Sequence, residues 1–471
     1  MSTFINLTEG LIIAYFIALN AIYLVFTVMA FFSLVGYRNR LWRGALRSVL
    51  SEAAYKPISL LVPAFNERET LIATIRSLLT LRYPEFEIVV VNDGSTDDTL
   101  DLVRRAFALY PVPSATRVQL PTRTVIATYR SLEHPNLVVI DKENGGKSDS
   151  LNAAINACSY PLFCCMDADS LLEPDSLLRV ARAFTEDERV ICAGGVIRVL
   201  NGSVVEDGAI THIRTPNNPL VLAQALEYVR GFLAGRAPLA RLDALMIVSG
   251  AFGLFRKDAV IAAGGYHTGT VCEDMEIIVR LHRHQRESGQ EGKIIFLPDP
   301  VCWTQVPSDW RSLLRQRDRW QRGLIESLWM HRGMFLNPRY GKAGLIGMPF
   351  YVIFEAFGPI FEMLGYVVLL LLALAGRLNP GIAVLFFLLA IANGIILSVM
   401  ALVLDDLLFK RYERARDLLK MIAAAFFEYL GYRQVLAIQR TASFLNVLFR
   451  RGYWGKVKRT QIPHSESAEA A

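Results

Sequence analysis

Residues 58–98 read ISLLVPAFNERETLIATIRSLLTLRYPEFEIVVVNDGSTDD and contain two short, continuous apolar runs. These runs, at 58–65 and 87–91, have the length and composition of strands that are buried on both faces of a sheet. A polar loop and a helical pattern follow each run, at 66–81 and from 96–98 onward. The segment therefore predicts two consecutive strand–loop–helix units.

The same unit occurs twice more along the chain. Strands are predicted at 137–140 and 162–166, and a polar loop follows each of them. Four such units are typical of an α/β domain with a mostly parallel sheet and helices on both faces. In such sheets ligands bind at the carboxyl ends of the strands. The polar residues predicted at these ends are Asn66, Glu67, Asp93, Lys147, Asp167 and Asp169.

Three apolar segments outside this region have the length of membrane spans, which need about 20 apolar residues. Leu11–Val35 and Gly381–Leu404 carry no charge, whereas 350–376 is interrupted by two glutamates and a proline. The mean hydropathy of +0.32 agrees with membrane segments. The first segment does not resemble a cleavable signal peptide, because residues 1–10 lack Lys and Arg and the apolar core is too long.

Loop charge predicts the orientation, since basic residues stay on the cytoplasmic side. The residues after the first segment include Arg38, Arg40, Arg43 and Arg47. A second basic cluster, 410–416, follows the third segment. The N-terminus is therefore expected outside and residues 36–350 inside. The tail 433–459 is also basic, so the apolar stretch 418–449 is predicted to be a re-entrant or interfacial helix pair rather than a crossing.

Composition and absent motifs argue against several classes of protein. The net charge of +6 is too small to indicate a nucleic-acid partner. The six cysteines form no CxxC pair, which predicts reduced, mostly buried thiols in a cytosolic domain. No GxGxxG follows the first strand and no GxxxxGK[ST] occurs, which disfavours hydride transfer and ATP hydrolysis.

Asp167-Ala168-Asp169 places two carboxylates directly after the fourth predicted strand. Carboxylates on a loop can bind Mg²⁺ or Mn²⁺, and the cation can neutralise a diphosphate. The alternative is a helix N-terminus in which Asp169 and Ser170 cap a helix that begins near residues 173–175. Their position at the end of a strand favours the metal site.

Asp93 and Lys147 follow two other predicted strands. Asp93 can accept hydrogen bonds from a base or a ribose, or it can be an ordinary turn residue. Lys147 follows two glycines at a helix start, where backbone N–H groups and the helix dipole favour a phosphate. The alternative for Lys147 is an exposed lysine without a ligand.

Two further groups of residues can carry chemistry. One carboxylate of Glu273–Asp274 can be a general base for an alcohol, or both can complement the dipole of the following helix. Gln316, Arg319 and Trp320 share one helix face, where an indole can stack on a sugar and a guanidinium can bind phosphate. The alternative for this face is an interfacial helix whose Arg and Trp reach lipid headgroups.

Glu355 and Glu362 lie seven residues apart in an apolar segment, on one helix face. Carboxylates in a membrane helix are costly and face the protein interior or a wet cavity. Two interpretations remain open, a polar translocation path and pairing with basic side chains.

In chain order, Asp93, Asp167-x-Asp169, Glu273–Asp274 and Gln316-x-x-Arg319-Trp320 resemble the motifs of membrane-embedded family 2 glycosyltransferases. This family includes cellulose, chitin, hyaluronan and poly-N-acetylglucosamine synthases. Asn144–Lys147 and Ser249–Gly250 also resemble family segments, and the resemblance covers residues 58–330 by motif. The chain departs from the family at Cys272, where the family has Thr, and in having fewer spans than the larger synthases.

The resemblance implies a GT-A fold and a role for each candidate residue. Asp93 would hold the uridine of a UDP-sugar, and the other residues implied at the donor are Asn66, Glu67, Lys147 and Asp167. Asp167 and Asp169 would bind Mg²⁺ or Mn²⁺ with the diphosphate. Asp274 would deprotonate the acceptor hydroxyl. The acceptor and diphosphate site would be lined by Glu273, Gln316, Arg319 and Trp320.

The resemblance also implies an inverting, metal-dependent transfer of a sugar from a UDP-sugar, and N-acetylglucosamine is the sugar we expect. The acceptor would be a growing polysaccharide at the cytoplasmic face of a bacterial inner membrane, and an accessory or export subunit is a further partner. Two alternatives remain, single-sugar transfer to a lipid and a non-catalytic receptor or export subunit. The expected parts are a first span (1–36), a catalytic domain (54–330), an interfacial segment (331–349), two spans (350–404), and interfacial helices with a basic tail (405–471).

Overall fold

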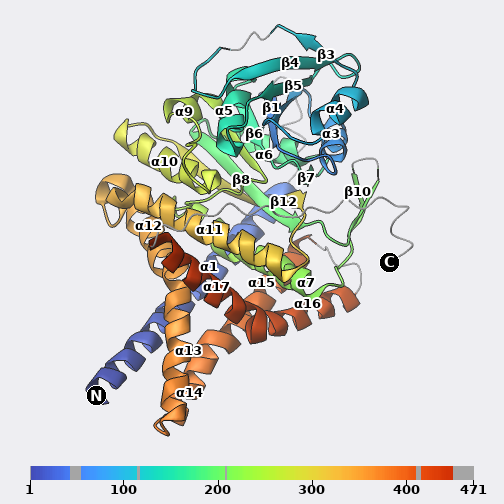
Figure 1. The fold of residues 1–471 in the computed structure, drawn as a ribbon. Coiled ribbons are helices and arrows are strands. Elements are labelled where there is room, and N and C mark those ends of the chain that lie inside the picture. Colours follow the sequence, from blue (N-terminus) through green and yellow to red (C-terminus); the bar gives the residue numbers. More distant parts are fainter. Residues whose placement is uncertain (1, 43–54, 114–116, 207–208, 410–414, 449–471) are drawn as a thin grey trace.

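The structure is a computed structural model that describes residues 2–42, 55–113, 117–206, 209–409 and 415–448. An α/β domain lies at one end of the molecule, and long helices extend from it at the other (Figure 1). Part of the predicted orientation rests on residues outside the described ranges, namely Arg43, Arg47, 410–414 and the tail beyond 448.

A ten-stranded sheet forms the centre of the α/β domain, in the order β3-β4-β5-β2-β1-β6-β11-β8-β12-β7. Its strands are β1 (Ile58–Ala64), β2 (Phe86–Asn92), β3 (Leu109–Val112), β4 (Val125–Ser131), β5 (Leu137–Lys142), β6 (Leu162–Cys165), β7 (Ser170–Leu172), β8 (Val190–Val199), β11 (Gly253–Arg256) and β12 (Lys293–Thr304). A separate two-stranded sheet pairs β9 (Val204–Glu206) with β10 (Ala209–His212).

The four strands predicted from the sequence, β1, β2, β5 and β6, are neighbours and run parallel, which confirms the α/β prediction. The sheet as a whole is mixed rather than mostly parallel, because β4 pairs antiparallel with β5 and β11 with β6. Several of the added strands leave little trace in the sequence, because β3 has no buried side chain and β7 and β11 are only three and four residues long. β8 and β12 are ten and twelve residues long and were not predicted.

Helices cover both faces of the sheet because alternate strand residues point to opposite sides. Leu60 and Val62 of β1 belong to the apolar cluster that includes α3 (Leu71–Leu79), α4 (Thr99–Ala106) and α6 (Ser176–Glu186). Leu61, between them, belongs to the opposite cluster, which includes α5 (Lys147–Ala157), α9 (Lys257–Ala262) and α10 (Glu273–Glu287).

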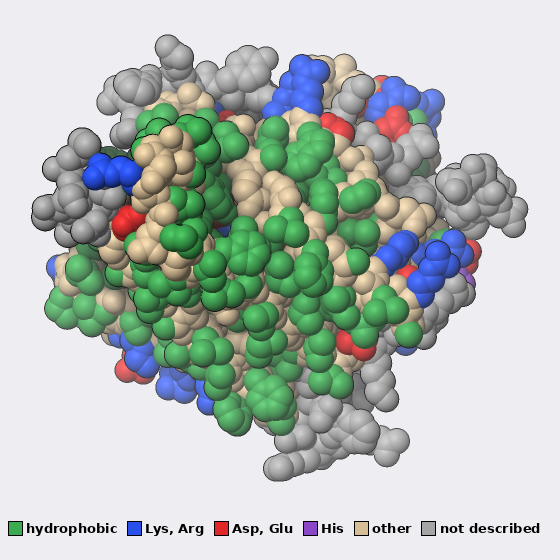
Figure 2. All heavy atoms as spheres, turned by 90° about the horizontal axis from the view of Figure 1, so that it is seen from below, with side chains coloured by type: hydrophobic (Ala, Val, Ile, Leu, Met, Phe, Trp, Pro, Cys, Tyr) green, Lys and Arg blue, Asp and Glu red, His purple; other side chains and the backbone are tan. Residues whose placement is uncertain are grey.

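Three helical stretches among the described residues are long and apolar enough to cross a membrane, at Thr8–Tyr37, Ala343–Leu374 and Pro380–Leu407. They match the three predicted spans. The elements involved are α1 (Ser2–Trp42), η5 (Ala343–Gly347), α12 (Met348–Phe350), η6 (Tyr351–Ala356), α13 (Gly358–Leu374), α14 (Pro380–Phe387), η7 (Leu388–Ala392) and α15 (Asn393–Phe409). Figure 2 shows that hydrophobic side chains cover this end of the molecule, as a lipid-facing surface requires.

The remaining helices connect the sheet to these spans. They are α7 (Pro219–Arg230), η2 (Gly231–Arg236), α8 (Ala237–Arg241), α11 (Trp310–Met330), η3 (Arg332–Met334), η4 (Pro338–Tyr340), α16 (Ala415–Phe427), η8 (Glu428–Tyr432) and α17 (Arg433–Leu448). Side chains cap three of them. Asn218 accepts from the N–H of Leu220 in α7, Asp309 from that of Ser312 in α11, and Asn337 from that of Arg339 in η4.

The C-terminal stretch predicted as a helix pair consists of α16 and α17, which are joined through η8. The backbone of η8 is not helical at Leu430 and Gly431, so the chain bends there. α17 packs against α11 and α13, which places it between the α/β domain and the second span. Its predicted position at the membrane interface stays a prediction.

A buried ion pair between Arg198 on β8 and Asp405 on α15 ties the sheet to the third span. Removing one partner of a buried pair costs about 3–5 kcal/mol, because the other charge is left uncompensated. We therefore predict that Asp405→Leu lowers the midpoint of thermal unfolding in detergent, and that Arg198→Met/Asp405→Leu recovers most of the loss. Equal midpoints for the single and double variants would contradict this account.

Candidate active site

A cavity of about 1290 Å³ begins at the carboxyl ends of the central strands and continues between the predicted spans. It brings together most of the residues singled out in the sequence, namely Lys147, Asp167, Asp169, Glu273, Asp274, Gln316, Arg319 and Trp320. Its membrane-level part is lined by Tyr15, Tyr23, Glu355, Glu362 and Tyr429, among others. Three predicted donor residues, Asn66, Glu67 and Asp93, are not part of the lining.

Asp93 is 3% exposed, and both of its carboxylate oxygens are occupied by the protein. Oδ1 accepts from Lys142 Nζ at 2.6 Å and from the Gly145 N–H at 2.9 Å. Oδ2 accepts from the Gly146 N–H at 2.8 Å and from Asn144 Nδ2 at 3.2 Å. These four contacts shape the turn that precedes α5. The predicted contact of Asp93 with a uridine stays a prediction.

Lys142 is the cation that makes this turn possible. Its side chain is fully buried, and Nζ forms ion pairs with Asp93 at 2.6 Å and with Asp149 at 2.7 Å. Gly146 adopts φ +86°, a conformation that favours glycine. The sequence did not predict this role for Lys142, because a single lysine at the end of a strand forms no recognisable motif.

Asn66 and Glu67 brace the loop after β1. Asn66 Oδ1 accepts from the N–H of Thr96 at 2.8 Å. Glu67 is 5% exposed, and its Oε2 accepts from the Thr70 hydroxyl at 2.9 Å. The Asn66 contact connects two loops, whereas the Glu67 contact is local, and neither side chain lines the cavity.

Lys147 is the first residue of α5, and its ammonium group bridges two other elements. Nζ lies 2.7 Å from Asp167 Oδ1, after β6, and 2.7 Å from Glu273 Oε1, on α10. Burial alone would lower the pKa of Lys147. The charges of Asp167 and Glu273 have the larger, opposite effect and hold this pKa well above its usual value. A cation that stays protonated is therefore held at a helix N-terminus, where a phosphate also binds favourably.

Asp167 and Asp169 both line the cavity, as their position after a strand predicts. β7 begins directly after Asp169, and α6 begins only at Ser176, so Asp169 and Ser170 do not cap a helix. No group of three or more His, Cys, Asp or Glu side chains that could hold a metal ion occurs in the described part of the chain. Two carboxylates fit a Mg²⁺ or Mn²⁺ ion whose other ligands are phosphate oxygens and water.

Asp274 lies in the first turn of α10, and its Oδ2 accepts from the Gly250 N–H at 3.1 Å. Burial and the charge of Glu273 raise the pKa of Asp274 to about 6, although Lys147 and Arg236 oppose the shift. A carboxylate with such a pKa is ionised at neutral pH and is a better proton acceptor than an ordinary aspartate.

Gln316, Arg319 and Trp320 share the cavity-facing side of α11, as their spacing predicts. The indole of Trp320 is 36% exposed. α11 lies close to the start of α10 because Gly323 makes room for Cys272. A Cβ at position 323 would overlap the Cys272 side chain. The base candidate and the aromatic side chain are therefore on helices in direct contact.

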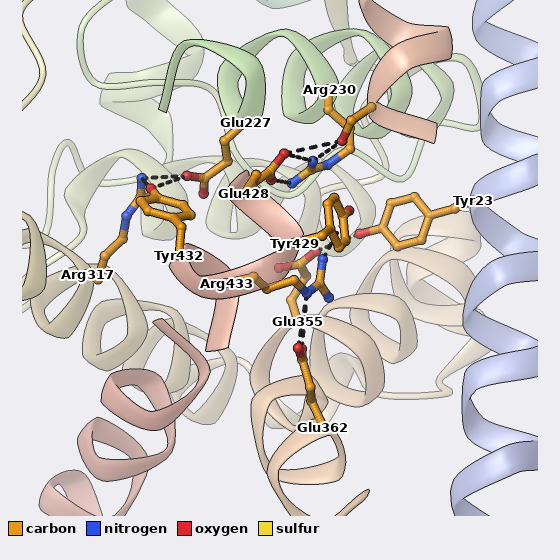
Figure 3. Close-up of polar contacts among 11 residues, drawn as sticks. Tyr23, Glu227, Arg230, Arg317, Glu355, Glu362, Glu428, Tyr429, Tyr432 and Arg433 are labelled. Atoms are coloured by element: carbon orange, nitrogen blue, oxygen red, sulfur yellow. Dashed lines mark hydrogen bonds and ion pairs between the residues drawn. The ribbon is translucent and has the colours of Figure 1, made fainter. Parts of the chain in front are cut away.

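The sequence left two interpretations open for Glu355 and Glu362, namely pairing with basic side chains and a polar translocation path. Glu362 pairs with Arg433 at 3.2 Å (Figure 3). Glu355 pairs with Arg440 at 3.7 Å, so pairing with basic side chains is confirmed. Tyr23 also donates to Glu355 at 3.2 Å. Both glutamates line the cavity as well, although they come from successive elements, η6 and α13, rather than from one uninterrupted helix.

Comparison with known proteins identifies the family to which the chain belongs. Residues 56–323 match the family described as Glycosyltransferase like family 2, and the chain belongs to it. A similar fold is found in the solved structure of the mannosyltransferase PcManGT from Pyrobaculum calidifontis in complex with GDP-Man and Mn²⁺. That structure aligns with a TM-score of 0.54 and 19% identity, covering 92% of this chain and 100% of that one. At this identity the likeness concerns the fold alone.

Among particular proteins, the chain is similar to the poly-beta-1,6-N-acetyl-D-glucosamine synthase of Staphylococcus aureus (strain COL). The two are 28% identical over 272 residues, which cover 58% of this chain and 55% of that protein. The synthase of the same name from Staphylococcus epidermidis is 27% identical over 277 residues, covering 58% of this chain and 56% of that protein. The match thus spans about half the length of these curated relatives.

The buried triad of Lys142, Asp93 and Asp149 generates a stability prediction. Lys142→Met leaves two buried carboxylates without their cation, so we expect a loss of about 3–5 kcal/mol in the free energy of unfolding. The control is Lys293→Met, which removes a partly exposed pair with Asp187 and should cost at most about 1 kcal/mol. Denaturant titration in detergent measures both losses. A loss in Lys142→Met no larger than in the control would contradict the prediction.

Proposed function

We propose that this protein transfers N-acetylglucosamine from UDP-N-acetylglucosamine to a growing polysaccharide, with inversion at the anomeric carbon. The main support is one continuous cavity that joins a cationic turn and two carboxylates, a base with a raised pKa, an exposed indole and a passage between the predicted spans. The similarity to the staphylococcal synthases favours N-acetylglucosamine as the sugar.

The donor's diphosphate binds beside the N-terminus of α5. Lys147 supplies a protonated ammonium group, and the turn held by Asp93 presents the start of the helix to the cavity. Asp167 and Asp169 would hold a Mg²⁺ or Mn²⁺ ion with the diphosphate. Such an ion supplies positive charge that stabilises the leaving UDP. The guanidinium of Arg319, which also lines the cavity, adds a second cationic group for the phosphates.

Asp274 acts as the general base. Its carboxylate takes the proton of the acceptor hydroxyl as the oxygen attacks the anomeric carbon and the bond to UDP breaks. The Gly250 N–H holds one carboxylate oxygen in place, and Trp320 provides a flat surface on which the acceptor sugar stacks. A single base suffices because the leaving diphosphate needs cations rather than a proton.

In the membrane, the proposed arrangement puts the catalytic domain at the cytoplasmic face of a bacterial inner membrane, with the N-terminus outside. The membrane-level part of the cavity, with Tyr15, Tyr23 and the paired glutamates, is then a polar path for the growing chain. An accessory or export subunit would act on the far side of this path.

The proposed activity is tested with purified protein in detergent, Mg²⁺ or Mn²⁺, and a panel of radiolabelled UDP-sugars. We predict label from UDP-N-acetylglucosamine in high-molecular-weight product, and a loss of about 10³-fold or more in Asp274→Asn. The matched control is Asp258→Asn, which changes an acid in the first turn of α9, outside the cavity, and should retain activity.

Label only in a short glycolipid would replace the polymerase proposal with single-sugar transfer to a lipid. No incorporation and no UDP release from any donor would contradict the catalytic proposal and favour a receptor or export subunit.

The raised pKa of Asp274 predicts the pH dependence of the reaction. Because the base must be deprotonated, kcat/KM should rise with pH through about 6 and then level off. Glu273→Gln removes a neighbouring negative charge that raises this pKa, so the rise should move to lower pH. UDP release measured from pH 4.5 to 8, roughly the range in which such carboxyl groups titrate, shows both curves. An unshifted curve in Glu273→Gln would contradict the assignment.

A further inference from the structure

The indole of Trp320 is covered on one face by another side chain of the same helix. The guanidinium carbon of Arg317 lies 4.3 Å from the centre of the Trp320 ring. The indole nevertheless remains 36% exposed and lines the cavity. A guanidinium stacked on an aromatic face attracts the ring electrostatically and restricts its rotation. The open side of the indole is therefore presented to the cavity in a defined orientation.

Arg317 is itself held from two other parts of the chain. Its side chain is 5% exposed, and Nη2 donates to Glu227 Oε2 at 2.7 Å and to the Tyr432 hydroxyl at 3.3 Å. The Tyr432 hydroxyl in turn donates to Glu227 Oε2 at 2.9 Å. Figure 3 shows this closed triangle of contacts, with the three residues coming from α7, α11 and η8.

We propose that Arg317, fixed by Glu227 and Tyr432, is a positioning residue that holds Trp320 as the stacking surface for the acceptor sugar. The proposal rests on the proposed function, which assigns Trp320 to the acceptor. Lys cannot replace Arg317 in this role, because an ammonium group lacks the planar fork that can stack on the indole while donating to Glu227 and Tyr432.

The triangle makes the C-terminal helix pair part of the acceptor site. Tyr432 follows all three predicted spans and is separated from Arg317 by 115 positions in the chain. It belongs to the bend between α16 and α17, and its ring also lies 6.0 Å from that of Trp310 on α11. A shift of this bend would therefore change the support of Arg317 and, through it, the orientation of Trp320.

The competing explanation is that these contacts only fasten α7 to the C-terminal segment. The chain offers a matched control for it, because Arg230 and Glu428 form an ion pair at 2.5 Å between the same two elements. Glu428 accepts hydrogen bonds from Arg230 and Ser398, and neither of these two residues stacks on Trp320. Glu428→Gln thus weakens the same junction without removing the support of the indole.

The test compares Arg317→Lys, Tyr432→Phe and Glu428→Gln in the full chain, with UDP-N-acetylglucosamine as donor and a short β-1,6-linked N-acetylglucosamine oligosaccharide as acceptor. We expect Arg317→Lys and Tyr432→Phe to raise the acceptor KM about tenfold, with the donor KM unchanged. Glu428→Gln should leave the acceptor KM within about twofold of wild type. Equal effects in all three variants, or no change in acceptor KM, would overturn the proposal.

A spectroscopic measurement separates failure of this proposal from failure of the proposed function. Protein labelled with 5-fluorotryptophan gives a fluorine resonance for each indole, and Trp320→Phe assigns the one from Trp320. Arg317→Lys should shift or broaden that resonance, whereas Glu428→Gln should not. This result holds even if wild-type protein transfers no sugar from UDP-N-acetylglucosamine. An unchanged Trp320 resonance in Arg317→Lys would overturn the positioning role by itself.

Discussion

Charged side chains are partly or fully buried around the junction of the catalytic domain, the predicted spans and the C-terminal helices, and they form pairs because isolated buried charges are costly. Arg198 pairs with Asp405, Arg230 with Glu428, and Arg433 with Glu362. The first pair connects β8 to the third span, the second connects α7 to the bend before α17, and the third connects α17 to the second span. One cavity continues from the ends of the strands to membrane level between the parts that these pairs join.

The donor side of the cavity depends on a second buried arrangement. Lys142 compensates the charges of Asp93 and Asp149, and Asp93 then holds the N–H groups of the glycine turn that starts α5. Lys147 is thereby placed between Asp167 and Glu273, from two different elements. The position of Lys147, the proposed phosphate-binding group, thus depends on Asp93 and Lys142, which do not line the cavity.

Sequence patterns predicted the features that arise from local spacing. The apolar runs of β1, β2, β5 and β6 indicated the parallel centre of the sheet, and helical spacing indicated the shared face of Gln316 and Trp320. Partners distant in the chain could not be predicted in this way. Asp93 lies at the expected strand end, but its oxygens accept hydrogen bonds from the last residue of the neighbouring strand β5 and from groups that follow this strand. The support of Arg317 by Tyr432 depends on tertiary packing and has no local pattern.

The most direct test of the central claim is an experimental structure of the full chain with UDP and Mn²⁺. The account predicts the diphosphate between Asp169 and the N-terminus of α5, with Lys147 in contact with it and Asp274 facing the position of the departed sugar. Nucleotide bound outside this cavity, or an Asp274 carboxylate turned away from it, would contradict the account.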